Sequence, residues 1–356
     1  MIVIDAHLDL GWNALGWNRD LTRDIDEMRK AESGMTEEHR GANTVSLSEM
    51  RKGEVAVCLA TVLARASASS QGDPMLDFRT QEIAYAMGKG QLAYYRILEK
   101  QGLLKMLRNR RDLKEHIDKW RPGDPSKLPL GYILSMEGAD PIVSPGQVVE
   151  WWNEGLRVVG LAHYGRSAYA HGTGPSGGLT PKGKDLLKAM QEVGMVLDMT
   201  HLSDESFWEA LELFQGPILA SHNNCRALVP GNRQFTDEQI HALIQRDSVI
   251  GAAFDSWMLC PGWVLGSTPV TAVKLEHVAD HIDHICQLAG NARHAAIGSD
   301  LDGGFGREQS PHDLDTIANL QAIPAILRKR GYSEPDIEGI MHGNWLRVFE
   351  NAWVKN

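Results

Sequence analysis

Short apolar runs alternate with longer amphipathic stretches along this 356-residue chain. Eight of the apolar runs predict β-strands near residues 2–6, 55–62, 131–136, 156–162, 195–200, 217–221, 248–254 and 295–299. Stretches with helical spacing predict helices near residues 44–52, 77–100, 103–119, 146–153, 181–193, 204–214, 236–246, 272–289 and 313–329. Because strands and helices alternate, we expect an α/β fold, a somewhat distorted (β/α)8 TIM-like barrel. A doubly wound open sheet is the alternative.

The remaining segments fit the same architecture. Residues 10–43 and 64–76 are polar and poor in strand patterns, so we predict loops that cover one mouth of the barrel. Residues 330–356 predict a helical C-terminal extension. Since no internal repeat or low-complexity linker interrupts the chain, we expect a single domain over residues 1–356.

The composition narrows the class of protein. Hydrophobic residues make up 43% of the chain, enough for a sizeable core, and the formal net charge is -10. This acidic balance argues against a nucleic-acid partner or an anionic membrane surface. The chain has no apolar run near the roughly 20 residues of a membrane helix, and its N-terminus enters a strand without a secretory-type leader. We therefore expect a cytoplasmic protein, with a removed precursor segment as the alternative.

Chemically reactive side chains gather where the predicted strands end. His7 and Asp9 lie two residues apart just past the first strand, so their side chains point to the same face of the chain. Later strand ends carry Glu137, His163, His201, His222 and Asp300. In a (β/α)8 barrel, the residues that carry out the chemistry lie at the carboxyl ends of the strands. We therefore expect all of these side chains to form one shared site.

The residue types in this set suit a pair of divalent metal ions. Three imidazoles and two or three carboxylates can hold two ions about 3.5–4 Å apart, bridged by a carboxylate and a hydroxide. Two cations lower the pKa of the bridging water, and one of them can polarise a substrate carbonyl. A free carboxylate on the last strand could take the proton of the water and deliver it to a leaving amine. This chemistry predicts the hydrolysis of an amide.

Five motifs carry a resemblance to a known family. They lie in order along the chain at residues 5–9, 136–138, 198–203, 221–222 and 297–303. Together they resemble the membrane (renal) dipeptidase family of the amidohydrolase superfamily, over most of the chain. The resemblance implies a distorted (β/α)8 barrel with two zinc ions per chain. It also implies hydrolysis of dipeptides, frequent acceptance of a D-residue at the C-terminal position, and a homodimer.

The resemblance further implies how the metal ions are held. His7 and Asp9 would hold one zinc ion, and His201 and His222 would hold the other. Glu137 would bridge the two ions.

The resemblance also implies three residues that act on the substrate. Asp300 would be the proton shuttle, with Asp302 as the alternative. His163 would contact the substrate carbonyl and the developing oxyanion. Arg233 matches the arginine that binds the C-terminal carboxylate of the substrate, a task that suits a guanidinium because it can pair with both oxygens. A surface arginine before a helix is the alternative for Arg233.

Neighbours of the motifs depart from the family pattern. Leu8 stands where the family commonly has Asn, and Tyr164 follows His163 where the family tends to run through Asn. Asn223 and Asn224 follow His222 where small hydroxyl residues are frequent. None of these residues is a predicted metal ligand. The departures therefore concern the preferred side chains of the substrate and leave the metal centre unchanged.

Two other functions are compatible with the same residues. One is a different binuclear amidohydrolase that acts on N-acyl amino acids, lactams or esters. The other is a catalytically silent barrel that keeps its metal ions and works as a binding protein.

A second group of histidines has a spacing that could bind a metal ion. His277, His281 and His284 fall on one face of the helix predicted over residues 272–289. That helix leads into the last strand and should lie on the outside of the barrel. We therefore expect packing or polar contacts for these histidines.

Overall fold

The computed structural model describes residues 1–67, 73–121 and 123–354. All eight predicted strands are present: β1 (Val3–Leu8), β2 (Val55–Leu63), β6 (Leu130–Glu137), β7 (Leu156–Gly160), β8 (Val196–Asp198), β9 (Ile218–Leu219), β10 (Ile250–Ala252) and β11 (Ala295–Ile297). Three short strands were not predicted: β3 (Arg65–Ala66), β4 (Asp77–Phe78) and β5 (Leu104–Met106). Every residue of β1, β2 and β6 is buried, as expected for parallel strands that are covered on both faces.

The strands follow one another in the order of a barrel. A seven-stranded parallel sheet runs β1-β2-β6-β7-β8-β9, with β5 paired to the start of β6, and β10 and β11 form a second parallel pair. An isolated parallel bridge between Ala220 and Ile250 continues the order from β9 to β10. Ser299, just after β11, donates two hydrogen bonds to the carboxylate of Asp5 on β1. The large sheet is thus curled into a half-barrel that β10 and β11 extend, which confirms the predicted distorted α/β barrel.

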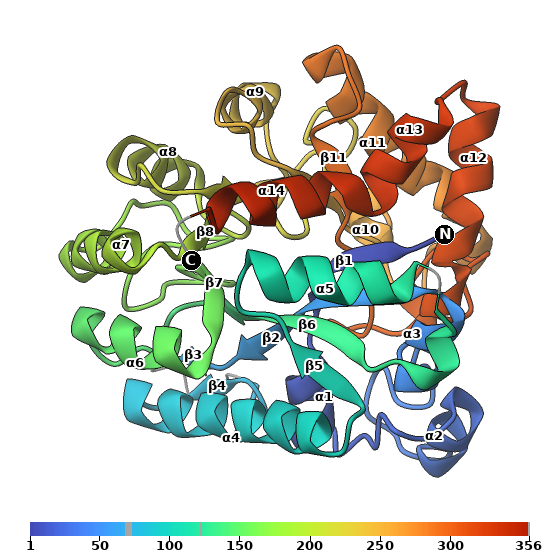
Figure 1. Cartoon of the computed structure of the whole chain (residues 1–356), viewed down its shortest axis with the longest axis horizontal. Helices are drawn as coiled ribbons and strands as arrows, with labels where there is room; N and C mark the ends of the chain where they lie inside the picture. The colour runs from blue at the N-terminus through green and yellow to red at the C-terminus, as the bar shows by residue number, and fades with distance from the viewer. Residues whose placement is uncertain (68–72, 122, 355–356) are drawn as a thin grey trace.

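Helices surround the strands (Figure 1). The α-helices are α1 (Leu10–Gly16), α2 (Ile25–Ala31), α3 (Leu47–Lys52), α4 (Gln81–Lys100), α5 (Arg110–Trp120), α6 (Val148–Glu154), α7 (Pro181–Val193), α8 (Asp204–Leu213), α9 (Asp237–Gln245), α10 (Ser256–Leu259), α11 (Leu275–Ala289), α12 (Ile323–Lys329), α13 (Glu334–Glu338) and α14 (Asn344–Ala352). Short 3-10 turns cover Pro125–Lys127, Pro145–Gln147, Val270–Ala272, Arg307–Gln309 and Ile317–Ala322, and a π-helical turn covers Gly339–Gly343.

Side-chain caps fix where several of these helices begin. The hydroxyl of Thr180 accepts a hydrogen bond from the N–H of Gly183, and a proline follows it at the first position of α7. The hydroxyl of Ser203 accepts from the N–H of Ser206 at the start of α8. Each cap satisfies a backbone donor that the first helical turn leaves unpaired. Both helices therefore begin at residues that the local sequence specifies.

Two predictions about helices and loops were wrong in part. The stretch 10–43 was predicted as a loop but contains α1 and α2, which are seven residues long each and bury side chains such as Leu10 and Ile25. Helices this short are too brief to show a periodic pattern and are stabilised mainly by packing. The helix predicted over 103–119 begins only at Arg110, because Leu104–Met106 pairs with β6. Residues 68–72 of the predicted loop 64–76 lie outside the described residues.

The predicted C-terminal extension is helical. It consists of α13, the π-helical turn and α14, and its last two residues lie outside the described part. Asn344 donates hydrogen bonds to the carbonyls of Ala292 and Ala295, and the indole of Trp345 donates to the carbonyl of Ile297 at 2.9 Å. These contacts attach the extension to β11.

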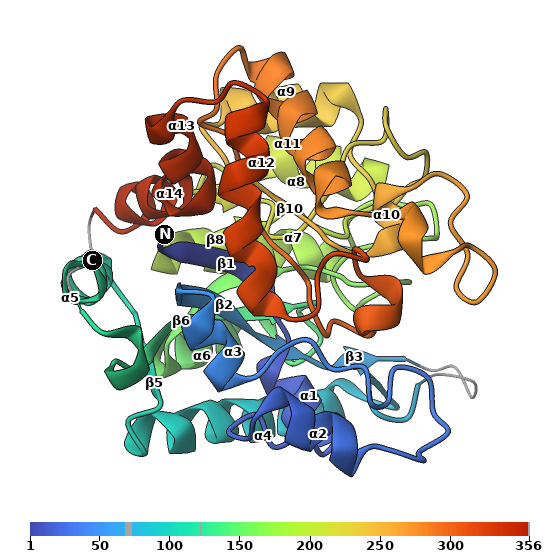
Figure 2. The ribbon, with the colours of Figure 1, turned by 90° about the vertical axis from the view of Figure 1, so that its right-hand side faces the viewer.

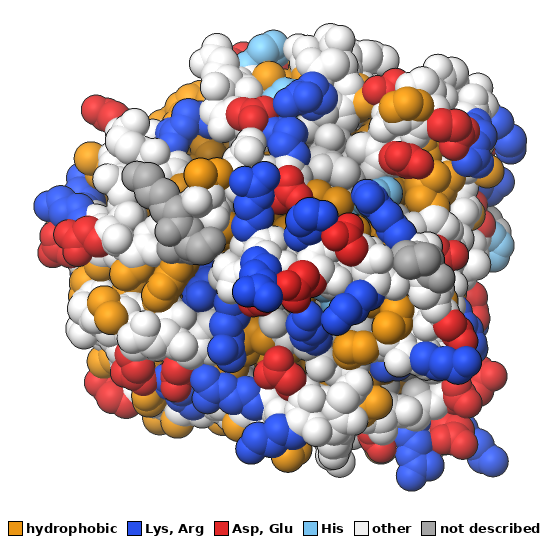
Figure 3. Space-filling model, viewed as in Figure 1, with side chains coloured by type: hydrophobic (Ala, Val, Ile, Leu, Met, Phe, Trp, Pro, Cys, Tyr) orange, Lys and Arg blue, Asp and Glu red, His pale blue; other side chains and the backbone are white. Residues whose placement is uncertain are grey.

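The molecule has two distinct sides. The N-terminus, the C-terminal end and α14 lie on one side of the strands, whereas α10 and β3 lie on the opposite side, toward which the strands run (Figure 2). Basic and acidic side chains are interspersed over the face shown in Figure 3. None of the helices in the described part of the chain combines the length and the apolar composition needed to cross a lipid bilayer.

Candidate active site

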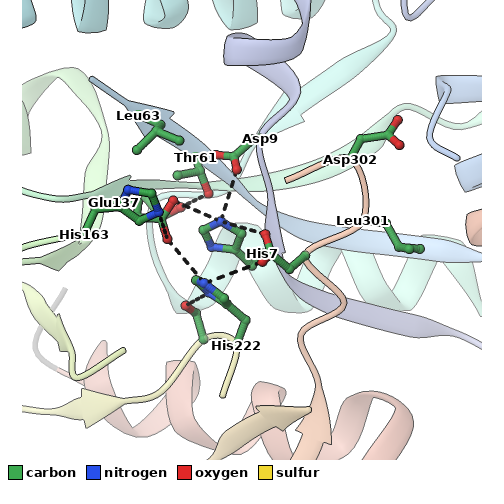
Figure 4. A network of polar contacts seen from close by, with 12 residues as sticks. His7, Asp9, Thr61, Leu63, Glu137, His163, His222, Leu301 and Asp302 are labelled. Atoms are coloured by element: carbon green, nitrogen blue, oxygen red, sulfur yellow. Dashed lines mark hydrogen bonds and ion pairs between the residues drawn. The ribbon is translucent and has the colours of Figure 1, made fainter. Parts of the chain in front are cut away.

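Six of the predicted site residues converge at the carboxyl ends of the strands (Figure 4). The ring nitrogen Nε2 of His7 lies 3.5 Å from a carboxylate oxygen of Asp9 and 3.5 Å from Oε2 of Glu137. The other oxygen of Glu137, Oε1, lies 3.1 Å from Nε2 of His201 and 3.3 Å from Nε2 of His222. Asp300 completes the group, with Oδ1 3.7 Å from Nε2 of His7. Glu137 therefore lies between two sets of ligand atoms.

The donor atoms of this cluster fit metal ions. Within the described residues, three overlapping sets have ligand atoms close enough to share an ion: His7–Asp9–Glu137, Glu137–His201–His222 and His7–His222–Asp300. Three buried polar atoms in the cluster, Nε2 of His7, Oδ1 of Asp9 and Oε1 of Glu137, have no hydrogen-bond partner among the described residues. Buried polar atoms are rarely left unpaired, because each costs about 1–3 kcal/mol. Two divalent cations, one on each side of Glu137, would satisfy all three.

The imidazoles of His201 and His222 are oriented by hydrogen bonds at their Nδ1 atoms. Nδ1 of His201 contacts the hydroxyl of Thr173 at 3.1 Å, and Nδ1 of His222 contacts the hydroxyl of Ser221 at 2.9 Å. Their Nε2 atoms then face each other at 3.2 Å. Hydrogen bonds of this kind hold metal-binding histidines in a fixed orientation. The arrangement is the one that two neutral imidazoles would adopt around a shared cation.

Two residues of the cluster have a strained backbone conformation. His201 and Asp300 have positive φ angles of 65° and 60°, in the left-handed region that side chains other than glycine rarely adopt. Such residues cost about 1–3 kcal/mol each and gather at functional sites. A Cβ atom on Gly303 would come within 2.0 Å of Oδ1 of Asp300, so the chain also needs a glycine there.

Asp302 has a different environment from Asp300. Its Oδ1 accepts hydrogen bonds from the N–H and the hydroxyl of Thr44, at 2.8 and 2.7 Å, and its Oδ2 accepts from the N–H of Val45 at 3.0 Å. In Figure 4 its carboxylate points away from the cluster. Asp302 therefore anchors the segment before α3, and of the two aspartates it is Asp300 that faces the cluster.

The cluster contains more negative than positive charge. Burial raises the pKa of Asp300 well above its ordinary value, and the nearby carboxylates of Glu137 and Asp9 reinforce the rise against the opposing effect of His7. Burial also lowers the pKa of His201 and His222 well below the ordinary value. Both rings are therefore neutral, which is the form that binds a metal ion, and added positive charge would relieve the crowding of carboxylates.

His163 lies beside the cluster with its proton position fixed by Arg65. A nitrogen of the Arg65 guanidinium lies 3.2 Å from Nδ1 of His163. Because a guanidinium can only donate, Nδ1 must accept, and the neutral ring carries its proton on Nε2. That side faces Glu137, 3.9 Å away. Burial lowers the pKa of His163 to about 4, opposed by Glu137 and reinforced by Arg65 and Arg233, so the ring is neutral at pH 7.

Arg233 lies in the wall of a cavity in front of the cluster. Its guanidinium donates to the side-chain oxygen of Asn223 and to the carbonyl of His222, the latter at 3.0 Å. The cavity has a volume of about 300 Å³. Six predicted site residues line it: Asp9, Glu137, His163, His201, Arg233 and Asp300. His7 and His222 lie outside this lining and are almost fully buried.

Three charged residues of the cavity were not predicted from the sequence: Arg65, Asp73 and Asp255. Arg65 follows β2 and Asp255 follows β10, so their positions at strand ends were a signal that the pattern offered. Arg65 forms a bidentate ion pair with Asp77, with N–O distances of 2.8 and 2.7 Å. This pairing joins β3 to β4, two strands too short to predict.

The chain is similar to several known proteins. It is 29% identical over 236 residues to an uncharacterized protein in the pqqA 5' region of Klebsiella pneumoniae, a match that covers 63% of this chain and 83% of that protein. It is also 29% identical to dipeptidase tcpJ of Claviceps purpurea, over 62% of this chain. The match spans about half the length of that fungal protein, 50%.

Solved structures share its fold. A metallopeptidase from Rhodobacter sphaeroides, solved with a phosphinate mimic of the dipeptide L-Ala-D-Ala, superposes with a TM-score of 0.79 over 99% of both chains at 21% identity. The probable dipeptidase PvdM from Pseudomonas aeruginosa superposes with a TM-score of 0.77 over 100% of this chain and 96% of the other, at 16% identity. At these identities the likeness concerns the fold.

The family is established by a match along the chain. The family model described as membrane dipeptidase, peptidase family M19, matches residues 1–355. The match includes every residue of the cluster and of the cavity wall described above. The chain therefore belongs to the membrane dipeptidase family, peptidase family M19.

Proposed function

We propose that this protein is a zinc-dependent dipeptidase that binds two zinc ions per chain. His7 and Asp9 would hold one ion, His201 and His222 would hold the other, and Glu137 would bridge them. The support is the position of Glu137, whose two oxygens face the two sets of ligands separately. When bound, the two cations would polarise the carbonyl of the substrate and lower the pKa of the water that attacks it.

Three residues of the chain would act on the substrate. The N–H at Nε2 of His163 would donate to the carbonyl oxygen of the scissile peptide and stabilise the charge that develops there. Asp300 would accept the proton of the attacking water and pass it to the departing amine. Arg233 would pair with the C-terminal carboxylate, since its guanidinium lines the same cavity.

The size of the cavity supports a small substrate. A volume of about 300 Å³ lies at the lower end of ligand sites and suits a dipeptide better than a longer peptide. The Rhodobacter sphaeroides metallopeptidase was solved with a mimic of L-Ala-D-Ala. By analogy with this bound mimic, we propose that the present chain accepts a D-residue at the C-terminal position.

One observation carries the proposal. In a chain of the membrane dipeptidase family, three buried ligand atoms without hydrogen-bond partners among the described residues lie beside two facing imidazoles. The predicted homodimer, the cytoplasmic location and the single domain stay predictions.

A substrate panel with metal analysis tests the proposal. The zinc-loaded protein should hydrolyse Ala-D-Ala or Ala-Ala and should fail on the N-acetylated and C-amidated forms. Asp300→Asn should lower turnover by about 10²–10⁴-fold while the zinc content stays that of the wild type. Hydrolysis of the N-acetylated forms would favour the other amidohydrolase function. A zinc-loaded protein that is inert to the whole panel would favour the silent barrel.

A further inference from the structure

Asp255 is a buried carboxylate in the wall of the substrate cavity. It follows β10 by three residues, and it lines the cavity together with Arg233 and His163. Only 7% of its surface is exposed. It also caps α10, since its Oδ1 accepts a hydrogen bond from the N–H of Trp257 at 3.3 Å. Asp255 therefore presents a carboxylate to the space where a substrate would bind.

This carboxylate has no cationic partner in the described part of the chain. The side-chain amide of Gln309 donates to both of its oxygens, at 3.0 and 3.1 Å, but no Lys, Arg or His nitrogen of the described residues lies within 4.0 Å. By contrast, Asp77 in the same region pairs with Arg65. A buried carboxylate without a counter-ion is costly. Burial raises the pKa of Asp255 to about 7, against the lowering effect of the hydrogen bonds from Gln309.

The charge of Asp255 affects substrate binding because Arg233, the proposed site of the substrate carboxylate, is close enough to interact with Asp255 electrostatically. The positive charge of Arg233 lowers the pKa of Asp255, although the two groups form no ion pair. A substrate carboxylate bound to Arg233 would bring a negative charge toward Asp255, which is unfavourable. A positive group on the same substrate would remove this conflict. The rings of Tyr164 and Trp257 line the cavity as well, and aromatic faces attract cations.

We propose that Asp255 selects dipeptides whose C-terminal residue carries a positively charged side chain, such as lysine. The ammonium group of that side chain would supply the missing counter-ion, while Gln309 keeps the carboxylate oriented. The C-terminal residue is the one concerned, because its carboxylate is the group that Arg233 would bind beside Asp255. The inference rests on the proposed function, since it uses Arg233 as the carboxylate site.

Matched substrates test the inference with the zinc-loaded protein. Ala-Lys, Ala-(Nε-acetyl-lysine), Ala-norleucine and Lys-Ala differ in the presence and the position of one positive charge. We expect kcat/KM for Ala-Lys to exceed that for Ala-norleucine by roughly tenfold or more, a difference of about 1.4 kcal/mol. Asp255→Asn should bring this ratio close to one. The control is Asp73→Asn, which removes an exposed carboxylate at the same cavity and should keep the ratio.

Three kinetic outcomes would overturn the inference. One is an equal rate for Ala-Lys and Ala-norleucine in the wild type. Another is a preference for Lys-Ala over Ala-Lys, which would assign Asp255 to the N-terminal residue. The third is that Asp73→Asn lowers the ratio of kcat/KM for Ala-Lys to that for Ala-norleucine as much as Asp255→Asn does. The preference would then come from the overall negative charge at the cavity and not from Asp255.

Binding separates this inference from the proposed function. Calorimetry with Asp300→Asn measures the affinity for Ala-Lys and Ala-norleucine without turnover. Suppose that the wild-type protein hydrolyses no dipeptide, while Asp300→Asn binds Ala-Lys through Asp255 at least tenfold more tightly than it binds Ala-norleucine. That result would refute the proposed function and support the inference. Equal affinity for the two peptides would refute the inference whatever the activity.

Discussion

Two groups of histidines in this molecule have sequence patterns that could bind a metal ion, but their ring nitrogens are arranged differently in the structure. The first group, His7, His201 and His222, comes from three separate strand ends, and each ring presents Nε2 to Glu137 within 3.1–3.5 Å. The second group, which we call the outer group, is His277, His281 and His284, on one face of α11.

Each histidine of the outer group is engaged by a nearby polar group. Nδ1 of His281 accepts a hydrogen bond from the N–H of Cys225 at 3.0 Å, and Nε2 of His284 lies 2.8 Å from a carboxylate oxygen of Asp237. Nδ1 of His277 accepts from the backbone N–H at the start of its own helix. His281 and His284 therefore hold α11 to neighbouring segments, and His277 caps its own helix. These are polar contacts of the kind predicted for this face of the helix.

The two groups differ in the direction of their ligand atoms, a property that spacing alone does not determine. Helical spacing places side chains side by side, but it does not turn their nitrogens toward one point. Strands that end at the same mouth of a barrel can turn the nitrogens of their histidines toward one point, and a carboxylate between the histidines completes such a cluster. In the first group Glu137 fills that position, whereas Asp237 contacts only one histidine of the outer group.

The comparison is tested most strongly by removing one histidine from each group. His222→Ala should lower the zinc content and reduce dipeptidase activity by roughly 10³-fold, because the ring would be both a metal ligand and a neighbour of Glu137. His284→Ala should keep both the zinc content and the activity. Metal analysis and initial rates measure the two effects.

The stability of both variants serves as the control for that experiment. Thermal unfolding of the metal-free proteins shows whether either substitution unfolds the chain, and His222→Gln offers a milder change if His222→Ala does. A folded His222 variant with full zinc content and full activity would show that the proposed centre is misplaced.

A smaller effect is expected from the residue that orients His163. Arg65→Met removes the donor to Nδ1, so the proton of the ring is no longer held on Nε2. We expect kcat to fall by roughly 10–100-fold, within the range found for groups that orient reactive residues, with little change in KM. Arg65→Lys keeps a donor and should recover part of the loss.

The zinc content distinguishes this positioning role from a structural one. Arg65→Met should keep its metal ions, because Arg65 contacts none of the proposed ligands. If the Met and Lys variants have the same kcat, or if both lose zinc, then Arg65 supports the cavity wall rather than the proton position of His163.

The strand-end residues were predictable, and the contacts between them were not. His7 and Asp9 could be placed because strand periodicity aims positions two apart at one face. The pairing of Arg65 with His163 joins residues 98 positions apart, and no local pattern encodes it. The same holds for Asp255 and Gln309, which lie 54 positions apart. Short elements such as β5 were missed because three residues do not show a period.

The smallest effect expected here concerns the pH dependence of stability in the outer group. The pKa of His281 is lowered to about 3, first by burial and then by the positive charges of His284 and His277. The ring is therefore neutral in the folded protein at pH 6.5, whereas in the unfolded chain it binds a proton near that pH. Because the unfolded state binds more protons, the contribution of His281 is present above pH 6.5 and is lost as the pH falls toward 3.

This pH dependence can be measured against a matched variant. Between pH 6.5 and 5.5, the free energy of unfolding of the wild type should fall by about 1 kcal/mol more than that of His281→Asn. The difference between the two proteins isolates His281, because every other ionisable group is common to both. Denaturant unfolding at the two pH values gives the result. Equal losses would mean that His281 carries a proton in the folded protein as well, so that burial does not keep its ring neutral.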